Sequence, residues 1–140
     1  MIEVHVEREL AFAEDRVWAL LSDFGDLTWT EGWDKLETEG EGIGMVRRII
    51  MPGIDPIEET LQSMDHDKKQ FSYTIPNMPI PVSDYRAEVS VAGVDTARSK
   101  VSWRCTAKQE GGSATDAAAM LEATYDQLLT WVEKALTERN

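Results

Sequence analysis

Six strand-like segments separated by very short breaks fill the middle of the sequence, and this spacing constrains the fold more than any other feature. The breaks are rich in turn-forming residues, as in EGEG, PGIDP and DHDKK. Breaks of this length allow antiparallel hairpins but leave no room for the crossover that parallel strands need. The sequence therefore predicts an antiparallel sheet. Its expected strands cover residues 33–40, 43–51, 56–65, 69–76, 82–92 and 97–108.

The segments on either side of these strands complete the element order. Residues 1–10 alternate between apolar and polar side chains, which predicts a seventh, half-buried strand. The apolar spacing in AEDRVWALLSDFGDL predicts a helix that ends near Gly25, and DLTWTEGW allows at most a short second one. The closing segment GGSATDAAAMLEATYDQLLTWVEKALTERN predicts the longest helix, with Ser113 and Asp116 as a capping pair.

This order predicts an α+β fold in which a seven-stranded, curved antiparallel sheet wraps around a long C-terminal helix, with one or two short helices after the first strand. A strongly twisted sheet curls, and its concave face must be covered. Only the C-terminal helix is long enough to cover it. A helix spanning a curved sheet makes poor contact in its middle, and the gap is either filled by large side chains or left as a pocket. No linker interrupts the sequence, so we expect one domain over residues 1–140.

Charge and composition exclude several classes of function. The formal net charge of −12 repels nucleic acid and anionic membranes. No apolar run reaches the ~18 residues that cross a bilayer, and the N-terminus does not resemble a signal peptide, so we expect a cytoplasmic protein. Cys105 is the only cysteine, and His5 and His66 lie on an outward strand face and in a turn. We therefore expect no metal site and no cofactor.

The stretch GIGMVRRIIMPGIDPIEETL, residues 42–61, places two charged pairs on neighbouring strands. Successive side chains of a strand point to opposite faces. One of Arg47 and Arg48 must therefore face the interior of the fold, as must one of Glu58 and Glu59. Local alternation does not choose between the two registers, because apolar residues flank both arginines. A buried arginine requires a buried carboxylate, since a single unpaired charge in a low-dielectric interior is costly.

Several segments occur in an order that resembles a known family. They are VWALLSDFGDLTW, GIGMVRRI, IEETLQSMD, FSYTIPNMPIPVSDYRAEVSV and SKVSWR. Together they resemble bacterial proteins of the polyketide cyclase/dehydrase type, which belong to the START/Bet v 1-like (SRPBCC) superfamily, over roughly residues 2 to 137. The resemblance implies a helix-grip fold with a deep, mostly apolar pocket between the sheet and the terminal helix. It also implies that Leu27 to Trp33 and the loops at 52–56 and 77–81 form the pocket's mouth.

The resemblance selects Arg47 and Glu59 as the inward pair, either contacting a ligand or only holding two strands in register. Glu59, Tyr85, Tyr73 and Arg47 are the candidates for a catalytic role. Trp18 and Trp131 are expected to pack helices. The expected ligand-binding residues are Arg47, Glu59, Tyr73, Tyr85, Trp103, Trp29, Trp33, Met51, Ile49 and Leu61.

The family's range leaves three functions open. The first is binding of a small hydrophobic or aromatic molecule, such as a lipid, a polyketide-like compound or an isoprenoid. The second is a cyclase or dehydratase in which Glu59 or a tyrosine moves a proton and Arg47 stabilises an oxyanion. The third is an interaction module resembling chaperone activators. We expect a small hydrophobic ligand as the partner, and a homodimer is compatible with these features.

Overall fold

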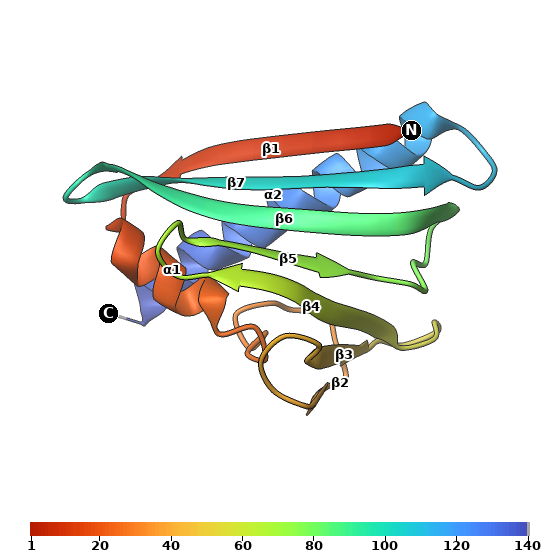
Figure 1. Cartoon of the computed structure of the whole chain (residues 1–140), viewed down its shortest axis with the longest axis horizontal. Helices are drawn as coiled ribbons and strands as arrows, with labels where there is room; N and C mark the ends of the chain where they lie inside the picture. Colours follow the sequence, from red (N-terminus) through yellow and green to blue (C-terminus); the bar gives the residue numbers. More distant parts are fainter. Residues whose placement is uncertain (140) are drawn as a thin grey trace.

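The structure, a computed structural model, describes residues 1–139 (Figure 1). Asn140, the last residue of the expected domain, lies outside the described residues. The described chain forms one seven-stranded sheet and two helices. The helices are α1 (Glu14–Ser22) and α2 (Ala114–Glu138). The strands are β1 (Ile2–Leu10), β2 (Lys35–Glu39), β3 (Val46–Ile50), β4 (Ile57–Asp65), β5 (Gln70–Thr74), β6 (Val82–Asp95) and β7 (Arg98–Gln109).

The sheet is antiparallel throughout, as the short breaks in the sequence predict. Its strand order is β1-β7-β6-β5-β4-β3-β2, so β2 to β7 follow one another as hairpins and β1 joins β7. The two longest strands, β6 and β7, pair with each other next to the β1 edge of the sheet, and β1 pairs with β7 along its whole length. With α2 across it, the sheet has the predicted helix-grip arrangement.

Of the one or two short helices predicted after the first strand, only α1 forms, and the segment that follows α1 consists of turns. Asp26 Oδ1 accepts hydrogen bonds from the backbone N–H and the hydroxyl of Thr28, at 2.9 and 2.6 Å. The Thr30 N–H donates to the Leu27 carbonyl at 2.9 Å. A short side chain that accepts a hydrogen bond from a nearby backbone N–H, as Asp26 does here, competes with helix formation. The segment between α1 and β2 therefore runs as turns, without a second helix.

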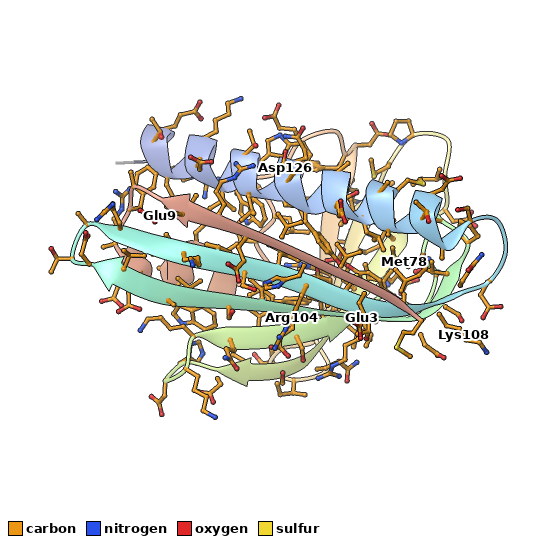
Figure 2. The ribbon with its side chains drawn as sticks, turned by 90° about the horizontal axis from the view of Figure 1, so that it is seen from above. Glu3, Glu9, Met78, Arg104, Lys108 and Asp126 are labelled. Carbon is orange, nitrogen blue, oxygen red and sulfur yellow. The ribbon has the colours of Figure 1, made fainter. Side chains whose placement is uncertain are left out.

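Helix α2 lies across one face of the sheet, and Arg104 points away from the other (Figure 2). The Ser113 hydroxyl caps the helix by accepting the Asp116 N–H at 3.3 Å, which is one half of the predicted capping pair. Within residues 1–139, α2 makes its main backbone contacts with β1, β7 and α1. Leu129 and Val132, both fully buried, face this contact. Arg8 of β1 binds Glu133 of α2 at 2.6 Å and ties the same edge together.

The one-sided packing of α2 leaves the concave surface of the sheet from β3 to β6 without direct helix cover. Aromatic side chains occupy part of this space. The Trp103 ring lies stacked with Tyr125 of α2 at a centroid distance of 5.9 Å, and Tyr73 lies 6.5 Å from Tyr85. Neither helix in the described residues combines the length and apolarity that a membrane span requires.

Candidate functional site

A cavity of about 480 Å³ lies between α2 and the concave surface of the sheet. Its walls come from β3, β4, β5, β6, β7 and α2, and its mouth comes from the segments around residues 27–33, 51–57 and 75–80. Met78, labelled in Figure 2, belongs to the last mouth segment and lines the cavity together with Met120 of α2. Apart from Arg47, Glu59, Glu31, two threonines and the tyrosine hydroxyls, the lining side chains are apolar or aromatic.

Almost all residues that the sequence assigns to a ligand site line this cavity. They are Arg47, Glu59, Tyr73, Tyr85, Trp103, Trp29, Trp33, Met51 and Ile49. Leu61 is the exception: it is buried but does not line the cavity. Its backbone bonds to Gly44 and Met45, and the Met45 side chain lies against Gly25; none of these three residues lines the cavity. Alternation correctly turns Leu61 inward, but at that point the interior is packed core.

Sequence reasoning places the pocket against the terminal helix but assigns none of the residues of α2 to the ligand site. The helix turns a second stripe toward the cavity, next to the stripe that packs on β1 and β7. Trp131, expected to pack helices, is part of that cavity stripe and is half-buried, whereas Trp18 does pack in the core. The sequence does indicate this second stripe, because the apolar residues of the C-terminal helix form a band wider than one helical stripe. The cavity side consists of Met120, Leu121, Thr124, Tyr125, Leu128 and Trp131.

Arg47 and Glu59 form a buried ion pair in the cavity wall. They sit directly opposite each other in the β3–β4 register, and Arg47 Nε donates to Glu59 Oε1 at 2.6 Å. Arg47 Nη1 also donates to the Phe24 carbonyl at 3.0 Å. The guanidinium lies between two rings, with its carbon 3.9 Å from the Phe24 centroid and 5.0 Å from that of Tyr73. The pair thus joins β3, β4, β5 and the chain after α1.

The neighbouring pair, Arg48 and Glu58, occupies the outer face of the same two strands. Its closest nitrogen and oxygen atoms are 3.5 Å apart, and Arg48 also approaches Glu37 and Glu39. The Glu58 side chain is 45% exposed, against 11% for Glu59. One hairpin therefore carries the same charge pair in solvent on one face and in the cavity wall on the other.

All three tyrosines of the chain, Tyr73, Tyr85 and Tyr125, line the cavity and are buried. The Trp103 indole donates to the Tyr73 hydroxyl at 3.1 Å, and the hydroxyls of Tyr85 and Tyr125 bond to each other. Burial raises the pKa of each phenol above its ordinary value, and the charge of Glu59 raises the pKa of Tyr73 further. These phenols stay protonated at neutral pH, so they can donate hydrogen bonds but cannot serve as bases.

The other reactive side chains offer little chemistry. Burial raises the pKa of the Cys105 thiol, which keeps it protonated and poorly nucleophilic. His66 lies outside the cavity, where its Nδ1 accepts the Trp18 indole N–H at 3.1 Å. In residues 1–139, His, Cys, Asp and Glu side chains form no cluster of three suited to a metal ion. The cavity's chemistry therefore rests on Arg47, Glu59 and the phenols.

The two tryptophans of the mouth are held by local hydrogen bonds. The Trp29 indole donates to the Asp26 carbonyl at 3.0 Å, and the Trp33 indole donates to the Thr30 carbonyl at 3.1 Å. Trp29 is buried, whereas Trp33 is half-buried and closer to solvent. The turn segment therefore presents rigid aromatic surface to the cavity entrance.

Replacing Glu59 with Gln should destabilise the fold far more than the same change at Glu58. Glu59→Gln leaves Arg47 charged and buried without its counter-ion, which costs roughly 3–5 kcal/mol. Glu58→Gln removes a solvent-screened contact and should cost under about 1 kcal/mol. Urea denaturation of both variants measures the difference. Equal losses of unfolding free energy would show that the inner pair is not desolvated.

Alkaline titration should reveal no tyrosinate in the folded protein. Because the folded-state pKa of each phenol is raised, the stabilisation from these groups is complete below the unfolded pKa near 10 and is lost as pH rises above it. Each phenol should lower the unfolding free energy by up to about 1.4 kcal/mol per pH unit in that range. Tyrosinate absorbance at 295 nm and near-ultraviolet circular dichroism should therefore change together. A tyrosinate transition near pH 10 with an intact dichroism signal would contradict the burial of the phenols.

Known structures share this architecture over nearly the whole chain. XoxI from Bacillus cereus has a TM-score of 0.87 and 24% identity, with 98% of this chain and 96% of that chain covered. A protein from Thermobifida fusca has a TM-score of 0.81 and 21% identity, with 99% and 95% covered. Norcoclaurine synthase from Thalictrum flavum, solved in complex with dopamine and hydroxybenzaldehyde, has a TM-score of 0.79 and 16% identity, with 99% and 87% covered. At these identities the similarity shows the shared fold alone.

The family comparison reaches further than the fold. No curated protein matches the chain significantly. The family described as "Polyketide cyclase / dehydrase and lipid transport" matches residues 1–137. That description and the fold support a function in binding a ligand. Because the match spans almost the full sequence, the chain belongs to the polyketide cyclase/dehydrase and lipid transport family, with a Bet v 1-like fold.

Proposed function

We propose that this protein binds a small hydrophobic or aromatic molecule, such as a lipid, a polyketide-like compound or an isoprenoid, between the sheet and α2. The observation that carries the proposal is the cavity of about 480 Å³, whose apolar walls enclose very few polar atoms. Sites for drug-sized ligands typically measure about 300–1,000 Å³ and share this lining. The volume and the chemistry of the walls both suit such a molecule.

The arrangement of the walls supports binding by enclosure. The inner residues Arg47, Glu59, Tyr85 and Trp103 are buried, whereas Ile54 and Met120 at the mouth are 44% and 50% exposed. A molecule that covers these two mouth residues would remove apolar surface from water, which favours association. Norcoclaurine synthase, solved with dopamine and hydroxybenzaldehyde, shows that a protein of this fold can hold aromatic molecules.

Catalysis is the second candidate, because Glu59 and the phenols lie in one cavity. Within residues 1–139, the Glu59 carboxylate is the only acidic group on the buried wall, and the charge of Glu59 acts on Tyr73. In a cyclase or dehydratase, Glu59 would accept a proton and a protonated tyrosine would donate a hydrogen bond to the developing oxyanion. Turnover lost with binding retained in Tyr85→Phe would favour this reading over pure binding.

An interaction module is less well supported. Such a module should expose a contiguous apolar patch outside the cavity. In the described part of the chain, the large apolar side chains left exposed are Met1, Ile43, Ile54, Val94 and Met120. Ile54 and Met120 belong to the cavity mouth, while Ile43 and Val94 lie on separate hairpins.

Filling the cavity from α2 should weaken binding of a neutral hydrophobic probe such as N-phenyl-1-naphthylamine. Leu128 lines the cavity, and the adjacent Gln127 is exposed and does not. Leu128→Trp should lower the affinity about tenfold, because a steric conflict in a packed site costs about 1–3 kcal/mol. Gln127→Trp should leave it unchanged. Probe fluorescence measures both affinities, and equal affinities in the two variants would place the probe outside the cavity.

A further inference from the structure

We propose that the cavity selects an uncharged ligand that ends in a hydroxyl group, an alcohol or a phenol, and discriminates against carboxylates and ammonium groups of the same shape. The inference rests on the proposed function, since it concerns which small hydrophobic molecule the cavity accepts. It follows from three observations: the balanced charge of the cavity lining, the hydrogen-bonding atoms of Arg47 and Glu59 that have no partner, and the burial of this pair.

In the described part of the chain, the cavity lining carries no unbalanced charge. Its charged residues are Arg47, Glu59 and Glu31. Arg47 and Glu59 neutralise each other at 2.6 Å, and Glu31, at the mouth, pairs with Lys134 of α2 at 3.1 Å. A ligand carboxylate beside Arg47 would also lie beside Glu59, and a ligand ammonium beside Glu59 would also lie beside Arg47. Either ion loses its water without gaining a free counter-charge, which opposes binding.

The same pair keeps one donor and one acceptor free. Arg47 uses Nε for Glu59 and Nη1 for the Phe24 carbonyl, and within residues 1–139 its Nη2 has no hydrogen-bond partner. Glu59 accepts through Oε1, and its Oε2 has no partner in the same residues. The Ser99 hydroxyl is the only fully buried side-chain polar atom without a partner there. Because Nη2 and Oε2 have no partner and are not among the fully buried unpartnered atoms, both atoms keep some accessible surface. Both side chains line the cavity, so that surface is available to a ligand.

A hydroxyl group matches this donor and acceptor. Its oxygen can accept from Arg47 Nη2 while its proton goes to Glu59 Oε2, so both atoms are satisfied by one ligand group. A carbonyl oxygen would satisfy Arg47 only, and a hydrocarbon would satisfy neither. Hydrogen bonds to ionised groups are stronger than those between neutral groups, so this contact should contribute strongly to the binding free energy.

The depth of the pair sets the ligand's orientation. The Arg47 and Glu59 side chains are only 5% and 11% exposed, whereas the mouth is lined by half-buried Trp33 and Met78 and by exposed Ile54. The hydroxyl end of the ligand should therefore enter first. Its apolar body then extends toward the tryptophan and methionine side chains of the mouth.

Four naphthalene derivatives with one ring system test the inference. They are 2-naphthylmethanol, 2-naphthoate, 2-naphthylmethylammonium and 2-methylnaphthalene, titrated into the purified protein at pH 7 by calorimetry or by displacement of the neutral probe. We expect the alcohol to bind at least about tenfold more tightly than either ion, since an unpaired buried charge outweighs a hydrogen bond. A carboxylate or ammonium that binds as tightly as the alcohol would overturn the inference, while the proposed function stands. Binding of none of the four would overturn the proposed function itself.

A variant then tests the assignment to this pair. Glu59→Gln leaves Arg47 as a free cation in the wall, so the affinity for 2-naphthoate should rise about tenfold or more relative to the native protein. The matched control Glu58→Gln, on the outer face of the same strand, should leave all four affinities unchanged. An unchanged preference in a folded Glu59→Gln variant would overturn the assignment. If that variant does not fold, the ligand series on the native protein decides the question.

Discussion

The ion pair between Arg47 and Glu59 is the interaction on which the rest of this site depends. It joins facing positions of β3 and β4, and through a hydrogen bond to the Phe24 carbonyl it connects them to the segment that follows α1. The rings of Phe24 and Tyr73 enclose the guanidinium. Such a pair is weak support for stability by itself, because desolvation offsets much of the attraction. Its importance here lies in its position in the cavity wall, where it places ionised polar atoms among mostly apolar and aromatic side chains.

The cavity exists because one straight helix cannot cover a curved seven-stranded sheet. Helix α2 packs against β1 and β7, where Leu129 and Val132 are fully buried, and in the described residues its main backbone contacts do not extend to β6, β5, β4 or β3. The remaining volume is partly filled by Trp103, Tyr73, Tyr85 and Tyr125, whose polar atoms bond to one another. These bonds satisfy the phenols without a charged partner. The cavity thus keeps largely apolar walls, with charge on its buried wall at the Arg47–Glu59 pair and at its mouth at Glu31.

The element order and the antiparallel sheet could be predicted from the sequence, because hairpin spacing and residue periodicity are local properties. Alternation also showed that one arginine and one glutamate turn inward, and the family resemblance selected Arg47 and Glu59, which are the buried pair. Three features of the site depend on tertiary structure and could not be predicted from local sequence patterns. Leu61 is on the expected face but packs in the core instead of lining the cavity, and Trp131 lies on a second helix stripe. The partners of the tyrosine hydroxyls come from strands and a helix far apart in sequence, and Tyr125 was not expected in the site.

The central claim is that a small neutral molecule enters the cavity between the sheet and α2, and the five tryptophan indoles can report this directly. Trp29, Trp33, Trp103 and Trp131 line the cavity, while Trp18 lies outside it. In a nitrogen–proton correlation NMR spectrum, adding 2-naphthylmethanol should shift the indole signals of the four lining residues and leave that of Trp18 in place. Shifts confined to Trp18, or equal shifts at all five, would contradict the account.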